Sequence, residues 1–253
     1  IADEFGKRRI HSGIVGQGVS MLIPILLKSG TADQKEKFIK KTLLGEFIWC
    51  QGYSEPEAGS DLASLRTQAI LDGDDWVING QKIWTSTAQL ADWMFCLVRT
   101  EPNAPKHEGI SFLLFPMCTP GIEIRPLKTM TGDASFNEVF FRDVRVPSSQ
   151  IVGERGEGWK VATTLLGHER SMLGDPNATQ ARFNSLVELM RTETVEGIPM
   201  IENPLWLDRL MKIQSRMLAL KANDLRILSA RLHKEDASLA NMIVKLEGTE
   251  LRH

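Results

Sequence analysis

The segment Trp49-Cys-Gln-Gly-Tyr-Ser-Glu-Pro-Glu-Ala-Gly-Ser-Asp61 and the nearby segment Asn79-Gly-Gln-Lys-Ile-Trp-Thr-Ser86 carry the strongest local signals in this chain. Residues 68–78 between them alternate apolar and polar side chains, and Asp72-Gly-Asp-Asp75 interrupts the alternation. Gly beside Asp is typical of a hairpin turn, because Gly accepts a positive φ and Asp can bond its own backbone. We therefore predict two short antiparallel strands, each followed by a polar, Gly-containing loop that presents N–H groups and hydroxyls to a ligand.

The β pattern extends outward from these segments and covers residues 47–152. Short runs rich in Val, Ile, Phe and Trp are separated by turn residues, which is typical of a small antiparallel barrel or sandwich. Residues 100–109 have the composition of a loop, and Pro147 should end the last strand because it cannot donate to a ladder. The further predicted strands are Trp93–Val98, Ile110–Phe115, Gly121–Arg125 and Phe136–Val146.

Before the β pattern, residues 14–46 read as helices. A mostly apolar helix should end at Gly30, and Thr31 with Gln34 forms a capping-box pattern that starts a second helix ending at Gly45. The apolar residues expected on one face of this second helix are Phe38, Ile39, Leu43 and Leu44.

After residue 152 the helical period returns. We predict helices over 159–172, 177–192, 204–233 and 237–251, with a loop over 194–203. The predicted domains are 1–46 (end of a helical domain), 47–152 (β-domain) and 153–253 (start of a second helical domain). The expected fold class is α+β, a central antiparallel β-domain between two helical parts.

Composition excludes several classes of function. The 253 residues contain 30 Lys and Arg against 32 Asp and Glu, so nothing indicates nucleic acid or an anionic membrane surface as a partner. No apolar run approaches the length that a membrane span needs. The three cysteines, Cys50, Cys96 and Cys118, lack metal-ligand spacing and are interpreted as reduced thiols.

The two segments quoted first resemble signatures of the acyl-CoA dehydrogenase family. Tyr53–Asp61 is similar to the family pattern (Thr/Ser)-Glu-Pro-Gly-Ala-Gly-Ser-Asp, and Asn79–Ser86 resembles its second flavin-contacting segment. Glu57 stands where the family usually has Gly, so this loop should not need a positive φ there. The helix–strand–helix order also matches the family, and the resemblance implies a partial chain that lacks segments at both ends.

The resemblance implies that this protein removes hydrogen from the α and β carbons of an acyl-CoA thioester. A base takes the α-proton and FAD takes the β-hydrogen as hydride, since no side chain can accept a hydride. The positions that match flavin contacts are Gln51, Tyr53, Ser54, Gly59, Ser60, Trp84, Thr85 and Ser86. Ser60 also matches a position that reaches the bound thioester. An alternative interpretation is that Trp84 is a core residue and that Ser54 and Ser86 are turn residues.

The candidate base lies in Gly167-His-Glu-Arg-Ser171. This segment resembles a family helix that ends in an active-site Arg, and Arg170 takes that position as a substrate-binding residue. Some family branches carry the catalytic Glu just before this Arg, and Glu169 matches it. Other branches place the base on a later loop, which would lie beyond His253, and a surface Glu paired with Arg is the structural alternative.

The resemblance leaves several points open. The chain could be a non-catalytic or partner subunit of a hetero-oligomeric acyl-CoA dehydrogenase, or a flavin acyl-CoA oxidase on the same fold. The implied partners are an acyl-CoA substrate, electron-transfer flavoprotein as electron acceptor, and further subunits in a homotetramer or heterotetramer. The implied location is the cytoplasm, as for bacterial members, or the mitochondrial matrix. Acyl chain length, branching and steroid character are not determined.

Overall fold

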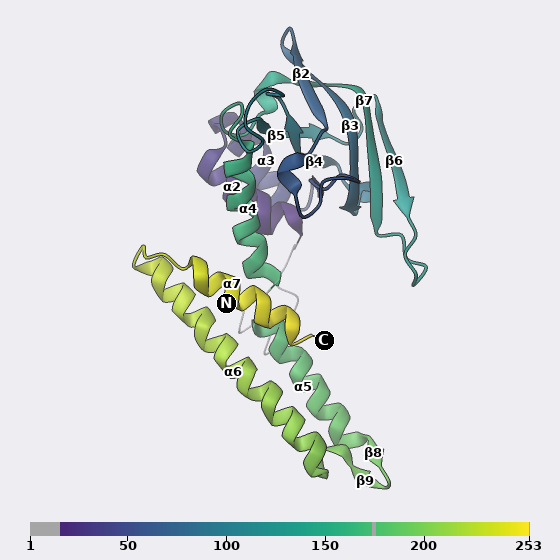
Figure 1. Ribbon diagram of the computed structural model, residues 1–253, viewed down its shortest axis with the longest axis vertical. Helices are drawn as coiled ribbons and strands as arrows, with labels where there is room; N and C mark the ends of the chain where they lie inside the picture. Colours follow the sequence, from purple (N-terminus) through teal and green to yellow (C-terminus); the bar gives the residue numbers. More distant parts are fainter. Residues whose placement is uncertain (1–15, 174–175, 253) are drawn as a thin grey trace. The chain divides into compact units, whose positions relative to one another are not determined.

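The computed structural model describes residues 16–173 and 176–252, with the side chains of 170–173 outside that description. The chain divides into two compact units, one within Gly13–Leu166 and one that contains Gly167–His253. Helices come first, then seven strands, then helices again, as Figure 1 shows by colour along the chain. The expected α+β class, with a central β-domain between helical parts, is confirmed.

The first unit opens with the π-helical turn η1 (Gly18–Leu22), followed by α2 (Ile23–Ser29) and α3 (Ala32–Leu43). The predicted capping box is present at the start of α3. The Thr31 hydroxyl accepts from the Gln34 N–H at 3.2 Å, and the Gln34 side chain accepts from the Thr31 N–H at 3.1 Å. Gly45 takes φ +74° just after the helix, and the Glu46 N–H bonds back to the Lys41 carbonyl at 2.9 Å. The helix therefore ends in a Schellman motif.

One detail of the predicted α3 face is wrong. Leu43 and Leu44 are about half exposed, whereas Gln34, Phe38 and Thr42 are buried. Side chains four positions apart lie above one another on a helix, so these three form the inward stripe. Leu43 and Leu44 lie farther around the helix and face outward.

A single curled sheet of seven strands follows these helices in the first unit (Figure 1). The order is β1-β4-β2-β3-β7-β6, with β5 pairing with β4. Most pairs are antiparallel, but β1 and β2 each pair with β4 in parallel. The strands are β1 (Trp49–Gly52), β2 (Gln68–Asp72), β3 (Asp75–Ser86), β4 (Trp93–Arg99), β5 (Ile110–Pro116), β6 (Ile122–Leu127) and β7 (Phe136–Pro147). Short 3-10 turns are η2 (Leu62–Ser64), η3 (Ala88–Leu90) and η4 (Ser148–Gln150).

The second quoted segment differs from its prediction. Asn79–Ser86 was expected to be a loop, but it is the second half of β3, because β7 pairs with it as far as Ser86. The pairing is irregular, with register shifts between Ile78 and Gly80 and between Lys82 and Thr85. The predicted hairpin turn is confirmed, since Asp72 pairs with Asp75 and Gly73 takes φ +64°.

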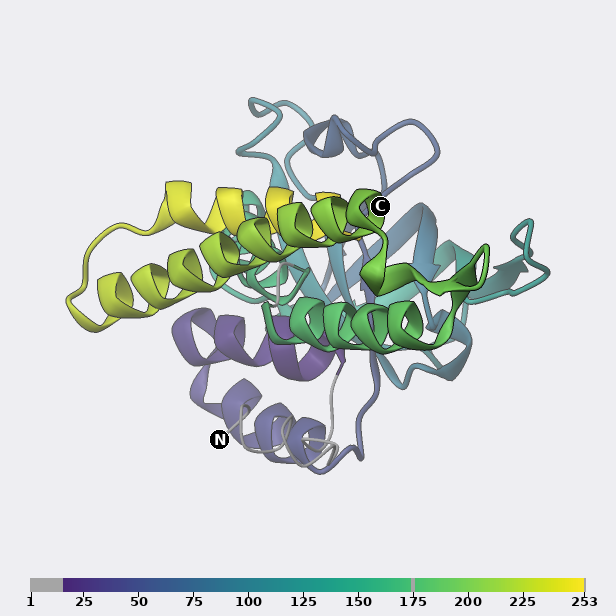
Figure 2. The ribbon, with the colours of Figure 1, turned by 90° about the horizontal axis from the view of Figure 1, so that it is seen from below.

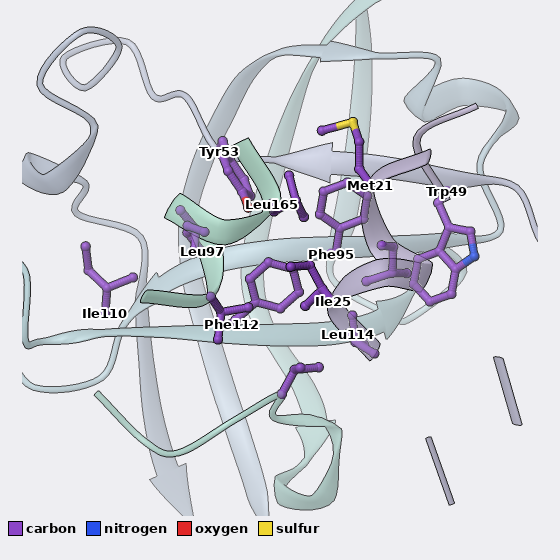
Figure 3. Packing of buried hydrophobic residues seen from close by; sticks show 14 of the residues in the cluster. Met21, Ile25, Trp49, Tyr53, Phe95, Leu97, Ile110, Phe112, Leu114 and Leu165 are labelled. Atoms are coloured by element: carbon purple, nitrogen blue, oxygen red, sulfur yellow. The ribbon is translucent and has the colours of Figure 1, made fainter. Parts of the chain in front are cut away.

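The core lies on both faces of the sheet. Along β4, Phe95 and Leu97 pack in one apolar cluster, and Met94, Cys96 and Val98 pack in the other. Burial on both faces explains why this strand is a continuous apolar run. Figure 3 shows the first cluster, in which Phe95, Phe112 and Tyr53 lie against helix residues such as Met21, Ile25 and Leu165.

The first unit extends into α4 (Gly158–Leu173), and the remaining elements belong to the second unit. They are α5 (Pro176–Thr192), β8 (Thr194–Val195), β9 (Ile198–Pro199), η5 (Met200–Glu202), α6 (Pro204–Leu232) and α7 (Ser238–Glu250). The predicted loop over 194–203 thus contains a small hairpin. Helices α6 and α7 run side by side (Figure 1, Figure 2), and each leaves much of its apolar surface exposed, including Leu218, Leu225 and Leu246.

Candidate functional site

Strand β1 positions the first candidate loop, which runs from Tyr53 to Asp61. Packing requires glycine at Gly52, the last residue of β1, because a Cβ there would lie 2.6 Å from the Met94 sulfur and 2.8 Å from the Cys96 sulfur. The loop then turns at residues 55–58, where the Glu55 N–H bonds the Ala58 carbonyl at 2.9 Å and the Ala58 N–H bonds the Glu55 carbonyl at 3.1 Å. The backbone of this segment is therefore fixed.

Glu57 lies at the exposed tip of this turn. It forms an ion pair of 2.7 Å with Arg66, and both side chains are largely exposed. Its φ lies outside the positive range, so the expectation that the loop needs no left-handed residue there is confirmed. An exposed pair of this kind contributes at most about 1 kcal/mol. The Glu57 carboxylate is thus turned toward Arg66 at the edge of the loop.

The far end of the loop is open. The φ of Gly59 is not in the left-handed range, and no heavy atom lies within 4 Å of the place that a Cβ would occupy. Nothing in the described protein therefore requires glycine there. Next in the chain, Ser60 is exposed, and Asp61 precedes the 3-10 turn η2. Hydrogen bonds from Lys106 (2.7 Å) and Ser64 (2.5 Å) hold the pKa of Asp61 below its usual range.

The second candidate segment presents Trp84 to the surface. The side chain is 59% exposed, and the residue takes φ +59°. Its one described aromatic contact is an edge contact with Phe136, at 6.0 Å between ring centroids. A bulky residue with positive φ is a true outlier, and such outliers cluster at functional sites. The core alternative for Trp84 is wrong.

Thr85 and Ser86 follow at the end of β3. Thr85 is buried, and its hydroxyl oxygen has no hydrogen-bond partner among the described residues. Its carbonyl accepts from the Asn137 side-chain amide at 3.0 Å, which ties this end of β3 to β7. Ser86 is half-buried and pairs with Phe136. A buried hydroxyl without a partner is costly unless a ligand or water satisfies it.

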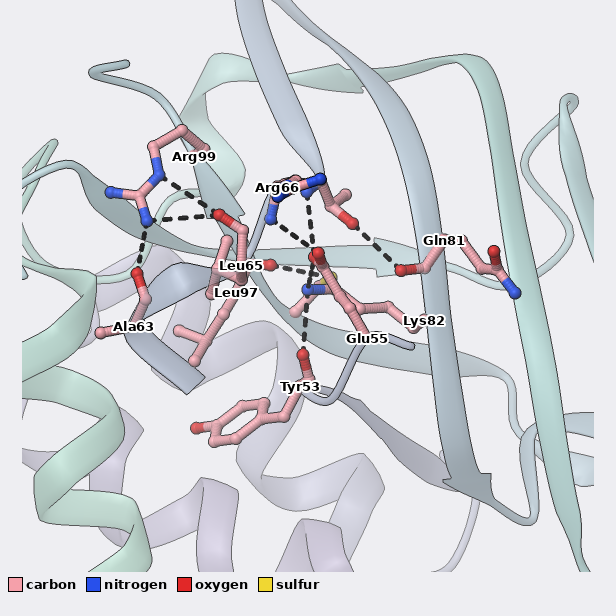
Figure 4. Close-up of polar contacts among 11 residues, drawn as sticks. Tyr53, Glu55, Ala63, Leu65, Arg66, Gln81, Lys82, Leu97 and Arg99 are labelled. Atoms are coloured by element: carbon pink, nitrogen blue, oxygen red, sulfur yellow. Dashed lines mark hydrogen bonds and ion pairs between the residues drawn. The ribbon is translucent and has the colours of Figure 1, made fainter. Parts of the chain in front are cut away.

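The two candidate segments lie side by side. The Ile83 N–H donates to the Ser54 carbonyl at 2.9 Å, and the Lys82 ammonium donates to the Tyr53 carbonyl at 3.1 Å. Figure 4 shows the bond from Lys82 to the Tyr53 carbonyl and the ion pair between Lys82 and Glu55, whose charged atoms are 2.8 Å apart. Tyr53 and Ser54 are therefore brought together with Trp84, Thr85 and Ser86.

Sequence reasoning missed Glu55 and Lys82. Lys82 is fully buried and Glu55 is 9% exposed, and Glu55 also accepts N–H bonds from Arg66 (2.6 Å) and Thr67 (2.9 Å). Burial opposes ionisation of Glu55, but the Lys82 charge and these hydrogen bonds outweigh it and hold its pKa below the usual range. The alternation of inward and outward side chains along β3 is the sequence signal that could have predicted an inward-facing Lys82.

A cavity of about 410 Å³ adjoins the second segment. Ser86, Thr87 and Leu90 line one side of it, and the remaining wall includes Val19 and Trp49. Its lining is mostly apolar, with the Ser86 residue among the few polar contributors. The first unit thus offers room for an apolar group next to Ser86.

The candidate base and its neighbour lie on α4. Glu169 is partly exposed and belongs to the second unit, whereas the flavin candidates belong to the first. The side chain of Arg170 lies outside the described residues, so its expected contact with substrate stays a prediction. Gln51 is half-buried on β1, next to the first loop.

Across residues 16–173 and 176–252, no three His, Cys, Asp or Glu side chains gather as a metal site would require. In the same ranges no helix combines the length and apolar character needed to cross a bilayer. Burial raises the pKa of both Cys50 and Cys96, that of Cys96 to about 12, so neither is a ready thiolate.

Comparison with known proteins gives a consistent result. Residues 50–144 match the model of the acyl-CoA dehydrogenase middle domain, and residues 156–253 match that of the acyl-CoA dehydrogenase C-terminal domain. The chain is 38% identical to acyl-CoA dehydrogenase IpdE1 of Mycolicibacterium smegmatis, over 99% of this chain and 69% of that protein. The matched curated relatives are longer, and the chain spans 31% to 69% of their length.

Solved structures agree with these matches. The ChsE4-ChsE5 complex of Mycobacterium tuberculosis is 34% identical with a TM-score of 0.84, over 99% of this chain and 64% of that one. The steroid ACAD Tcur3481-Tcur3483 is 33% identical with a TM-score of 0.77, over 92% of this chain and 62% of that one. On the fold, the two adjoining segments and these matches, the chain belongs to the acyl-CoA dehydrogenase family.

Proposed function

We propose that the complete protein is an FAD-dependent acyl-CoA dehydrogenase. The observation that carries this proposal is the hydrogen bond between the Ile83 N–H and the Ser54 carbonyl, which brings the two flavin-type segments together. Side by side, they offer one ligand the open backbone at Gly59 and the exposed indole of Trp84. A flat aromatic ring with an attached pyrophosphate suits this combination.

In this proposal the cofactor is held by the two segments. Gln51, Tyr53 and Ser54 would hold its ring from the first segment, and Trp84, Thr85 and Ser86 would hold it from the second. Gly59 and Ser60 would hold the pyrophosphate, because a backbone without a Cβ can come close to it. Bound FAD supplies the acceptor for the β-hydrogen, which leaves as hydride. N–H and O–H donors from these residues stabilise negative charge that develops beside them.

We propose that Glu169 is the base that removes the α-proton. The carboxylate takes the proton from the α-carbon, and Arg170 and Ser60 help to hold the thioester. Positioned acid–base groups of this kind contribute about 100- to 10,000-fold in rate. The support for Glu169 is its place on α4 in a segment that resembles the family's active-site helix.

We further propose that the acyl group enters beside Ser86. The cavity of about 410 Å³ in that place is mostly apolar, as an acyl binding site requires. A steroid side-chain thioester is one candidate, because a similar solved structure is described as a steroid ACAD. Fatty acyl thioesters are the other candidate, since the family acts on both.

A second candidate is a subunit that works only with an unlike partner. The ChsE4-ChsE5 complex and Tcur3481-Tcur3483 are each named as a pair of proteins, which favours this alternative over a flavin acyl-CoA oxidase. The exposed apolar residues of α6 and α7 support an assembly, either a homotetramer or a heterotetramer. Electron-transfer flavoprotein is the proposed acceptor of the electrons.

The test is the visible spectrum of the purified complete protein, recorded without oxygen before and after adding acyl-CoA thioesters. The panel contains straight-chain, branched and steroid side-chain thioesters. A bound flavin that bleaches with one thioester supports the dehydrogenase and identifies its substrate class. Flavin that bleaches with none, but does so after an unlike partner is added, supports the paired subunit. Protein that binds no FAD under any of these conditions contradicts the proposal.

A further inference from the structure

The ion pair between Glu55 and Lys82 is unusual because both partners are buried. Lys82 is 0% exposed and Glu55 is 9% exposed, and their charged atoms are 2.8 Å apart. Glu55 uses both oxygens, since one accepts from Lys82 and Thr67 and the other accepts from Arg66. The pair therefore carries four buried or part-buried polar contacts, counting the bond from Lys82 to the Tyr53 carbonyl.

Stability alone is a poor explanation for such a pair. Taking two charges out of water costs several kcal/mol, and apolar residues of similar volume are often as stable or more stable. The other described ion pairs lie at the surface, with side chains that are more than a third exposed. What distinguishes the buried pair is its place between the two flavin-type segments.

The pair acts on a single peptide group of the first loop. Lys82 donates to the Tyr53 carbonyl, and the same planar peptide carries the Ser54 N–H on its opposite side. Fixing the carbonyl therefore fixes the direction of that N–H. The neighbouring Ser54 carbonyl accepts from the Ile83 N–H, so two consecutive peptides are tied to β3.

The second segment is fixed by the same contacts. Lys82 and Ile83 directly precede Trp84, whose exposed indole depends on a positive φ. Between Lys82 and Thr85 the register with β7 shifts, so strand pairing alone holds this stretch weakly. The buried side chain of Lys82 anchors the strand just before the irregularity.

We propose that Glu55 and Lys82 are positioning residues that hold the Tyr53–Ser54 peptide and Trp84 in the geometry that binds the flavin. Neither side chain touches the cofactor in this proposal, because both are buried behind the segments that do. The inference rests on the proposed FAD site, and it goes beyond that site by naming the groups that set its shape.

The test uses the complete protein with FAD and three variants. Lys82→Met removes the charge and the bond to Tyr53, and Glu55→Gln/Lys82→Met also removes the carboxylate that would otherwise be buried alone. Arg145→Met is the matched control, because it breaks an ion pair of 2.6 Å with Asp72 at the exposed turn end of the same hairpin. The melting temperature of each apoprotein is measured by thermal unfolding, and its FAD dissociation constant is measured by flavin fluorescence.

We expect the double variant to melt closer to the wild type than Lys82→Met does, because no unpaired charge is left in the core. Its FAD dissociation constant should stay at least tenfold above the wild-type value, since the tether to Tyr53 is missing. The visible circular dichroism of flavin bound at saturation should also change. Arg145→Met should alter neither the affinity nor the spectrum.

Wild-type FAD affinity in the double variant would overturn the inference. If Lys82→Met and the double variant do not fold, Glu55→Gln decides, because it keeps the side chain's shape, removes the charge and replaces one acceptor oxygen with an NH2 donor. A severalfold weaker FAD affinity in that variant supports the positioning role, and an unchanged one refutes it. A wild-type protein that binds no FAD would instead contradict the proposed function, so the two failures are distinct.

Discussion

Replacing Gly59 with Ala should separate what the fold requires of the first loop from what the ligand requires. The φ of Gly59 suits any residue, and its missing Cβ has no heavy atom within 4 Å. An Ala there meets no steric obstacle in the protein, and it reduces the freedom of the unfolded chain. We therefore expect the apoprotein to be unchanged or more stable, by up to about 1 kcal/mol. For a chain of this size that is a rise in melting temperature of up to about 4 °C.

Ligand binding should move in the opposite direction. In the proposed site the backbone at Gly59 approaches the FAD pyrophosphate, where an added methyl group would hold the ligand away. We expect the FAD dissociation constant to rise at least tenfold, which corresponds to about 1.4 kcal/mol. The assays are thermal unfolding of the apoprotein by circular dichroism and titration with FAD followed by flavin fluorescence.

Gly80→Ala is the matched contrast for this experiment. At Gly80 a Cβ would lie 2.7 Å from the Thr67 Cα, and the φ of +150° already suits few other residues. Because backbone cannot move as a side chain can, we expect a loss of about 1–3 kcal/mol in the apoprotein. A Gly59→Ala protein that binds FAD as the wild type does would refute the approach of the loop to the cofactor. One that unfolds as readily as Gly80→Ala would refute the open geometry.

Four further predictions concern the base, the flavin contact, a helix cap and acid stability. Glu169→Gln should leave FAD bound and stop its bleaching by substrate; bleaching at the normal rate in stopped flow would move the base elsewhere. Ser86→Ala should keep the fold and slow flavin reduction, because a donor is lost, and an unchanged rate would contradict that role. Thr31→Ala removes half of the capping box and should lower the free energy of unfolding by about 1 kcal/mol in urea titration. The pKa of Glu55 is lowered in the fold, so its contribution persists above about pH 4.3 and is lost as the pH falls below that value. The difference in melting temperature between wild type and Glu55→Gln should therefore shrink in acid.

Local chemistry made most of the fold predictable. The Thr31 capping box, the turn at Gly73 and the end of β7 at Pro147 depend on neighbouring residues alone, and the sequence displays them directly. The buried run of β4 was predictable because a strand covered on both faces is apolar throughout. The parallel pairing of β1 with β4 was not, since it joins residues more than forty positions apart and no local pattern encodes it.

The sequence predicted the residues proposed to contact the ligand, but not the buried residues that hold them in place. Resemblance pointed to Ser54 and Trp84, and the fold brings their segments together. Glu55 and Lys82 look like ordinary charged residues of a polar segment, and only tertiary structure turns them toward each other. Lys82 and Glu55 are 27 positions apart in the chain, and their pairing depends on the tertiary fold. Hydrophobic periodicity and secondary-structure propensity describe only neighbouring residues and do not predict such a pair.

The alternation of β3 explains why Lys82 and Trp84 lie as they do. Trp76 and Ile78 face inward, and continuing the period of two turns Lys82 inward as well. The same period would bury Trp84, but the register shift between Lys82 and Thr85 turns it outward and buries Thr85 instead. A strand that buries an ammonium and exposes an indole reverses the usual preference of both side chains. Burying the Lys82 ammonium costs free energy, and so does exposing the Trp84 indole. A ligand that stacks on this indole, at a site whose shape depends on the bond from Lys82 to the Tyr53 carbonyl, explains both features.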